Sequence, residues 1–213
     1  MKRTRILLAD DHTMICDAFR KLLEPQYEVV DSVRDGHALM KAAVELKPDI
    51  ALVDVGMPLL NGLDAARELK KKAPGVKLIF LTMNTDPDVA SEALRIGASG
   101  YLLKSAPGIE LLQAVHDVVD EKSYVTPQIK RALDEIRVRD PKALERPKHL
   151  TPRERQVLQL LAEGRSGKEI ADILEMSQRT VWFHKYRIMQ ELGINSTAEL
   201  VQYAIKHGII STA

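Results

Sequence analysis

The chain has 213 residues, 45% of them hydrophobic and 29% charged, which is enough for two globular domains with cores. Its single cysteine, Cys16, excludes a disulfide bond within the chain and predicts a reducing, cytoplasmic location. The apolar run after the basic N-terminus ends at Asp10, too short for a signal peptide or a membrane span, so no membrane partner is expected. Residues 1–120 carry 15 basic and 18 acidic side chains and residues 121–213 carry 16 and 12, which suggests different partners for the two parts.

Apolar runs separated by helical patterns predict an α/β domain over residues 1–120. The runs are continuous rather than alternating, as in strands buried on both faces of a sheet. They are Ile6–Ala9, Val29–Val33, Ile50–Val53, Leu78–Leu81 and Tyr101–Leu103. Each is followed by apolar residues at helical spacing, the last set between Leu111 and Val119. Alternation of this kind predicts a doubly wound, five-stranded parallel sheet.

Polar residues gather where these strands end. The first strand ends on Asp10 and Asp11, the third on Asp54, the fourth on Thr82 and the fifth on Lys104. Ligands bind outside the carboxyl ends of the strands in such sheets, so these side chains are expected to share one site. No glycine-rich turn follows the first strand, which argues against a free nucleotide. A phosphoryl group held together with Mg²⁺ fits the carboxylates better.

The segments LLADDH, LVDVGMP, FLTM and GASGYLLK occur in this order between residue 5 and about residue 120. The ordered set resembles the receiver domain of bacterial two-component response regulators, which has a flavodoxin-like fold. The resemblance implies that Asp54 accepts a phosphoryl group. It also implies that Mg²⁺ is held by Asp10, Asp11, Asp54 and the carbonyl of Gly56.

The same resemblance assigns three residues to a switch. Thr82 would bond a phosphoryl oxygen, Lys104 would be its charge partner, and Tyr101 would turn inward when Thr82 moves. Taken alone, each has a simpler interpretation: Tyr101 as a core or surface aromatic, Lys104 as a solvated cation, Thr82 as a helix cap. Many receivers have proline after the lysine, with a cis peptide bond. Ser105 follows here, and a cis bond before it would cost about 2.5–4 kcal/mol, so a trans bond is expected.

Residues 121–147 are interpreted as a linker. Prolines interrupt this segment, and its charge is dense and mixed. Apolar residues at helical spacing in PQIKRALDEIRVR predict a short helix, which a flexible tether would follow.

Residues 148–213 are predicted to form an all-α domain of four helices, at roughly 152–162, 167–174, 178–191 and 197–207. Capping boxes beginning at Thr151, Ser166 and Ser196 mark three helix starts. Glycines mark the helix ends, at Gly164, Gly193 and Gly208. The second and third helices are joined by the tight turn EMSQ, which is helix-turn-helix spacing.

The third helix of this domain has a predicted buried face made of Val181, His184, Ile188 and Leu192. The segment from Leu150 to Gly193 resembles the LuxR-type helix-turn-helix, and the whole chain resembles a NarL/FixJ-type response regulator. The expected contacts to double-stranded DNA are Arg179, Thr180, Trp182, Phe183, Lys185, Tyr186 and Arg187. Lys185 is expected to reach a phosphate, and Trp182 stands where the family usually has lysine, so the family's base contacts are not carried over.

These observations predict a phosphorylation-controlled transcription factor rather than an enzyme. A sensor histidine kinase would phosphorylate Asp54, the chain would form a homodimer, and the third helix would read the major groove. Three alternatives stay open: a regulator that never uses phosphate, a flavodoxin-like enzyme that binds a nucleotide or flavin, and an adaptor whose aromatic helix contacts another protein. The missing glycine-rich loop argues against the enzyme. The acid–threonine–lysine set argues against the phosphate-independent regulator.

Overall fold

The computed structural model describes residues 3–139 and 150–210. Its sheet consists of β1 (Arg5–Ala9), β2 (Glu28–Val33), β3 (Ile50–Asp54), β4 (Lys77–Thr82), β5 (Gly100–Leu103) and β6 (Tyr124–Val125). The strands are parallel and follow the order β2-β1-β3-β4-β5-β6. Every residue of β3 is buried, as the continuous apolar run predicted. The predicted doubly wound parallel sheet is therefore confirmed.

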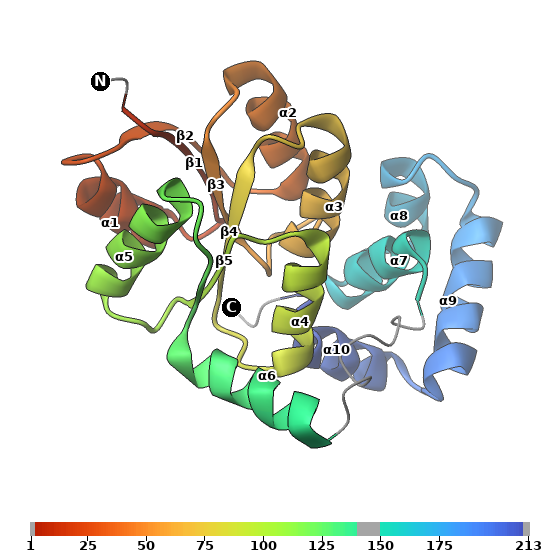
Figure 1. The fold of residues 1–213 in the computed structure, drawn as a ribbon. Helices are drawn as coiled ribbons and strands as arrows, with labels where there is room; N and C mark the ends of the chain where they lie inside the picture. The colour runs from red at the N-terminus through yellow and green to blue at the C-terminus, as the bar shows by residue number, and fades with distance from the viewer. Residues whose placement is uncertain (1–2, 140–149, 211–213) are drawn as a thin grey trace.

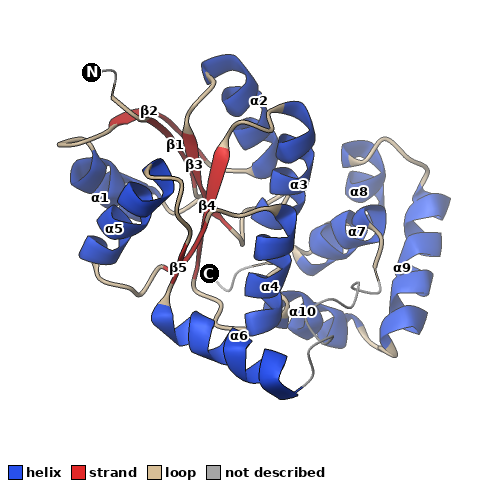
Figure 2. Ribbon diagram, viewed as in Figure 1, coloured by secondary structure: helices blue, strands red, loops and turns tan. Residues whose placement is uncertain are grey.

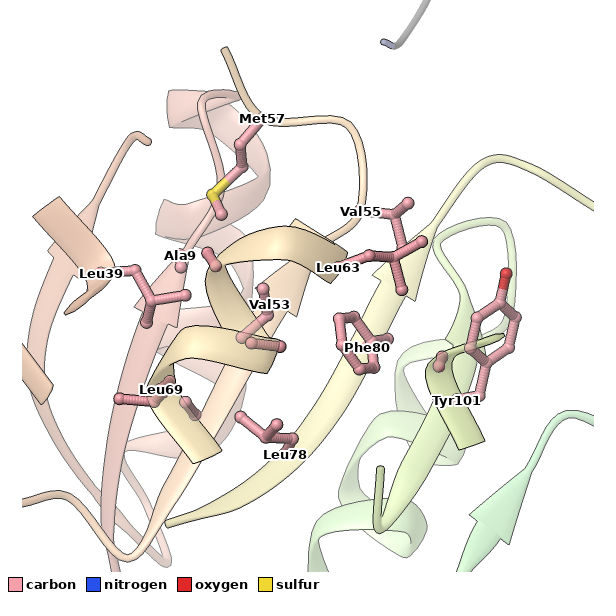
Figure 3. Close-up of a cluster of buried hydrophobic side chains, with 14 of the residues drawn as sticks. Ala9, Leu39, Val53, Val55, Met57, Leu63, Leu69, Leu78, Phe80 and Tyr101 are labelled. Carbon is pink, nitrogen blue, oxygen red and sulfur yellow. The ribbon is translucent and has the colours of Figure 1, made fainter. Parts of the chain in front are cut away.

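Helices cover both faces of the sheet (Figures 1 and 2). They are α1 (Thr13–Leu23), α2 (Gly36–Leu46), α3 (Gly62–Lys72), α4 (Pro87–Ile96) and α5 (Gly108–Val119). One face packs on α1 and α5, and the other on α2, α3 and α4. Figure 3 shows the hydrophobic core on the face that packs on α2, α3 and α4, where Val53 and Phe80 from the sheet meet Leu63 and Leu69 from α3.

The sheet has one strand more than the five that the sequence predicted. β6 pairs with β5, with Tyr124 opposite Gly100 and Val125 opposite Tyr101. Two residues are too few to produce a periodic signal, so sequence patterning could not reveal this strand.

The helix predicted within residues 121–147 is present as α6 (Pro127–Arg139). It packs against α4 and buries Ile129 and Leu133 in the core of the α/β domain. The sequence placed this helix in the linker, but its packing makes it part of the α/β domain. The tether expected after it falls largely on residues 140–149, which lie outside the described residues.

The helical C-terminal domain consists of α7 (Pro152–Ala162), α8 (Gly167–Ile173), α9 (Gln178–Leu192) and α10 (Thr197–Lys206), each within a residue of its predicted bounds. The predicted capping boxes at Thr151 and Ser166 are present. The third differs, because Ser196 caps α10 but the Glu199 side chain accepts from the N–H of Asn195, one residue before the cap. Among the described residues, no helix is long and apolar enough to cross a membrane.

The two domains are in contact. α7 and α10 lie beside α3 and α4, whereas α9 lies on the outer side of the C-terminal domain, away from the sheet (Figure 1). The predicted recognition helix is therefore not covered by the α/β domain.

Candidate functional site

The strand ends bring the predicted acids and the predicted lysine together. The Nζ of Lys104 lies 2.8 Å from Oδ2 of Asp10 and 2.9 Å from Oδ2 of Asp54. All three side chains are at least 95% buried, so water screens their charges little. β1, β3 and β5 position them, because each strand delivers its last or following residue to the same edge of the sheet. The sequence-based grouping of these residues is thus found in the structure.

Four side chains at this edge could hold a metal ion. Single ligand atoms from Asp10, Asp11, His12 and Asp54 all lie within 4.8 Å of one another. Three of the four are carboxylates, the donors that a hard divalent cation such as Mg²⁺ prefers. Gly56 lines a cavity together with His12 and Asp54. The donor set therefore fits Mg²⁺. His12 was not among the metal ligands predicted from the sequence. Its Nδ1 lies 3.0 Å from Asp10 and 3.1 Å from Asp11, and its position just before α1 did not predict these contacts.

Burial and ion pairing act in opposite directions on the central pair. Burial raises the pKa of the Asp54 carboxyl above its ordinary value, and the Lys104 ammonium offsets only part of that effect. Burial by itself would lower the pKa of Lys104, but the Asp54 and Asp10 carboxylates outweigh it and the pKa lies above its ordinary value. Lys104 is therefore a cation, and it lies beside an Asp54 carboxyl whose charged form is disfavoured by burial.

The two other predicted switch residues lie on neighbouring strands, Thr82 at the end of β4 and Tyr101 within β5. Thr82 is buried, and its Oγ1 accepts a hydrogen bond from the N–H of Asn84 at 2.9 Å. Tyr101 is fully buried and packs in the same core as Phe80 (Figure 3), and burial raises its pKa. The inward position expected for a switched Tyr101 is the one that this structure has. No cis peptide bond occurs in residues 3–139 and 150–210, so Lys104–Ser105 is trans, as expected.

A cavity of about 610 Å³ opens beside Asp54, Thr82 and Lys104. Its opposite wall comes from the C-terminal domain, with Lys206 and Gly208 among its residues. The side chain of Asn84 donates to the carbonyls of Ile205 and Lys206, at 3.3 and 3.0 Å, at the end of α10. Sequence reasoning could not find this wall, because nothing local in the sequence shows which domain surfaces meet.

A second interdomain contact reaches the loop after β3. Gln159 of α7 is fully buried, and its amide nitrogen donates to the carbonyl of Met57 at 2.9 Å. Its amide oxygen accepts from the backbone N–H and the side chain of Asn61, at 2.9 and 3.0 Å. Leu59, held at a left-handed φ of 64°, donates its N–H to Glu163. A non-glycine residue in that region costs about 1–3 kcal/mol, so α7 supports a strained loop.

Charged side chains extend this interface. Arg155 of α7 lies 2.9 Å from Asp64 of α3 and 3.7 Å from Glu92 of α4. Arg67 also pairs with both acids. Burial lowers the pKa of Arg67 to about 10, and the nearby Arg155 cation contributes to this shift. Two acids are thus shared by two guanidinium groups, one from each domain.

The predicted DNA-contact residues fall into two groups. Trp182, Phe183 and Tyr186 are 50, 57 and 61% exposed, and Arg179 is also exposed. These values are high for large apolar side chains, and they favour a binding surface on α9.

Arg187, Thr180 and Lys185 each make a polar contact within the domain, although Arg187 is also exposed. Arg187 lies 3.5 Å from Glu154 of α7, and Thr180 shares a hydrogen bond with the capping Ser177. Lys185 lies beside Thr197 and over the Trp182 ring. The predicted buried face is only partly buried, because Val181 and Ile188 are in the core whereas His184 and Leu192 are half-buried.

Comparison with known families covers both domains. A family model described as the response regulator receiver domain matches residues 6–116. A second, described as bacterial regulatory proteins of the luxR family, matches residues 148–204. The chain is also 36% identical to the oxygen regulatory protein NreC of Staphylococcus carnosus, over 97% of this chain and 99% of that protein.

Solved structures resemble the chain over nearly its whole length. The RcsB response regulator of Salmonella typhimurium, 27% identical, covers 97% of this chain with a TM-score of 0.71, and 99% of that chain is matched. A structure of two RcsB dimers bound to two parallel DNAs, 28% identical, covers 96% of this chain and 99% of that chain, with a TM-score of 0.60.

Proposed function

Because the chain belongs to the NarL/FixJ-type response regulators, DNA-binding regulators of transcription that phosphorylation controls, we propose that Asp54 is its phosphoacceptor. The observation that carries the proposal is the position of Lys104, whose ammonium bridges Asp54 and Asp10 at 2.9 and 2.8 Å. This cation lies where a phosphoryl group on Asp54 would place its added negative charge. A carboxylate that burial disfavours is also a stronger candidate for chemistry than a solvated one.

The carboxylates of Asp10, Asp11 and Asp54 and the carbonyl of Gly56 would hold Mg²⁺. When bound, the ion would neutralise part of the charge on the phosphoryl oxygens. In the transfer itself, a carboxylate oxygen of Asp54 forms the new bond to phosphorus. The bond from phosphorus to the donor breaks, and the donor keeps that electron pair. Lys104 then balances the charge on the product, and the hydroxyl of Thr82 donates to one of its oxygens.

A path from this site to the C-terminal domain runs through Asn84. Its N–H donates to Thr82 and its side chain donates to the end of α10. A shift of Thr82 toward a phosphoryl group on Asp54 would pull residue 84 and strain the two bonds to α10. The arrangement in this structure, with the two domains in contact, is the closed arrangement. The phosphorylated chain would favour separated domains, because the interface loses contacts that only the closed arrangement makes.

The partners follow from the two domains. The phosphoryl donor would be a sensor histidine kinase, and the phosphorylated chain would act as a homodimer that binds double-stranded DNA through α9. Support comes from the exposed aromatic and basic face of α9 and from the RcsB dimers bound to DNA. A cytoplasmic location remains an inference from the single cysteine.

The test is a DNA-binding titration by fluorescence anisotropy, with and without acetyl phosphate and Mg²⁺. The probe is a fragment recovered by genome-wide footprinting with the full chain. Wild-type protein should bind this fragment more tightly after treatment, and Asp54→Asn should not respond. A response of equal size in Asp54→Asn would rule out Asp54 as the control point. Tight binding by wild type that treatment leaves unchanged would favour the regulator that does not use phosphate.

A further inference from the structure

The ring of Trp182 packs against Gly167 at the start of the neighbouring helix α8, and this packing site is the seat of Trp182. A Cβ atom added to Gly167, the first residue of α8, would lie 2.8 Å from Cζ2, 3.1 Å from Cε2 and 3.4 Å from Nε1 of Trp182. The indole ring therefore lies directly against the backbone of α8, and only glycine leaves room for it there. The capping box of Ser166 and Glu169 holds this end of α8 with two reciprocal hydrogen bonds.

This contact directs Trp182 toward the flank of α9 that faces α8. In a helix-turn-helix the second helix lies in the major groove while the first helix crosses the DNA backbone. A side chain held between the start of the first helix and the second helix would therefore lie near the DNA backbone when α9 is in the groove. Trp182 is still 50% exposed as a residue, so the seated ring can meet a ligand.

A cation stands beside the same ring. The Nζ of Lys185 lies 5.3 Å from the ring centroid of Trp182. The indole Nε1–H is a neutral donor that cannot accept, and an ammonium group provides three donors and a positive charge. Together they match a phosphate oxygen, which only accepts and is negative. Donors alone do not separate a phosphate from guanine, whose N7 and O6 also accept in the major groove, so the position of the ring beside α8 is what favours phosphate.

We propose that Trp182 and Lys185 bind one phosphate of the DNA backbone, with Gly167 as the seat that fixes the indole ring, and that Trp182 does not read a base pair. Base reading is left to three other exposed residues of α9, namely Arg179, Phe183 and Tyr186. This differs from the interpretation of Trp182 as part of the sequence-reading set. The inference rests on the proposed DNA-binding role of α9.

Phosphate contacts position a protein without specifying sequence, so the proposal predicts a particular pattern of losses. Trp182→Phe keeps an aromatic ring on Gly167 but removes the N–H. It should weaken binding to the footprinted fragment and to a random-sequence duplex of about 20 bp by the same factor, about tenfold, with no change in salt dependence. Lys185→Gln should also weaken both, and should reduce the slope of log affinity against log salt by about one.

Gly167→Ala tests the seat without touching a DNA-contact side chain. Alanine favours a helix more than glycine does, so the domain should stay folded, which circular dichroism can verify. Trp182 is the chain's only tryptophan, so its emission reports on the seat directly. The displaced indole should emit at longer wavelength, and affinity for both DNAs should fall together.

Phe183→Ala is the matched control on the outward face. It should lower affinity for the footprinted fragment about tenfold or more while leaving random DNA nearly unchanged. A loss confined to the footprinted fragment in Trp182→Phe would overturn the proposal and make Trp182 a base reader. Unchanged binding to both DNAs in that variant would overturn it as well, leaving only a packing role. Failure of the phosphorylated wild-type protein to bind either DNA would remove the proposed function together with this inference.

Discussion

Replacing Gln159 with methionine tests how strongly α7 holds the loop after β3. Methionine has nearly the same length as glutamine but neither donates nor accepts as an amide does. The change removes the bonds from Gln159 to Met57 and Asn61, and leaves the Asn61 N–H and the Met57 carbonyl without this partner in a buried interface. Each buried group that loses its partner costs about 1–3 kcal/mol, so the closed arrangement should lose about 2–6 kcal/mol.

Separation of the domains relieves that loss, because water then reaches both groups. We therefore expect Gln159→Met to open the interface rather than unfold either domain. Small-angle X-ray scattering should show a larger radius of gyration than for wild type, while circular dichroism should show unchanged helix content. Gln113→Met is the control, because Gln113 lies exposed on α5 and its side chain donates to Asp117 of the same helix. If Gln159→Met scatters like wild type and like the control, Gln159 does not hold the domains together.

Further variants test the buried charges, the pH dependence and a helix cap. Lys104→Met should lower the free energy of unfolding at neutral pH by about 3–5 kcal/mol, because it leaves Asp10 and Asp54 facing each other without their cation. Added Mg²⁺ should restore much of this free energy in urea titrations. No response to Mg²⁺ would count against the metal site. Because the pKa of Asp54 is higher in the folded chain than its ordinary 3.8, the folded state binds that proton more tightly. The stability of wild type relative to Asp54→Asn should therefore rise as the pH falls toward 3.8 in EDTA, and a fall would refute the burial argument. Thr151→Ala should cost the C-terminal domain about 1 kcal/mol in thermal unfolding, with Thr197→Ala, which makes no cap, as the control.

Elements with a strong local signal could be predicted from the sequence. The strands of the sheet core and the helices α7 to α10 follow from apolar periodicity, capping residues and glycine stops, which act within a few residues of each other. The clustering of Asp10, Asp54 and Lys104 also followed, because parallel strands end at one edge.

What escaped prediction depends on contacts between distant segments. The pairing of β6, the burial of Ile129 and Leu133, and the hydrogen bonds of Gln159 each join parts of the chain that carry no local mark of the partner. Gln159 in particular sits among leucines on α7 and is fully buried, although its sequence position predicts only a helix. The packing of Trp182 on Gly167 also joins separate segments, and a glycine at the start of a helix does not indicate in the sequence that an aromatic ring packs on it.

The central claim is that Asp54 accepts a phosphoryl group in a site that needs a divalent cation, and intact-protein mass spectrometry tests it most directly. The full chain is incubated with acetyl phosphate and Mg²⁺, alongside Asp54→Asn and a wild-type sample in EDTA. The account predicts one added phosphoryl group on wild type, none on Asp54→Asn and none in EDTA. A label that persists on Asp54→Asn, or that forms equally well in EDTA, would contradict it.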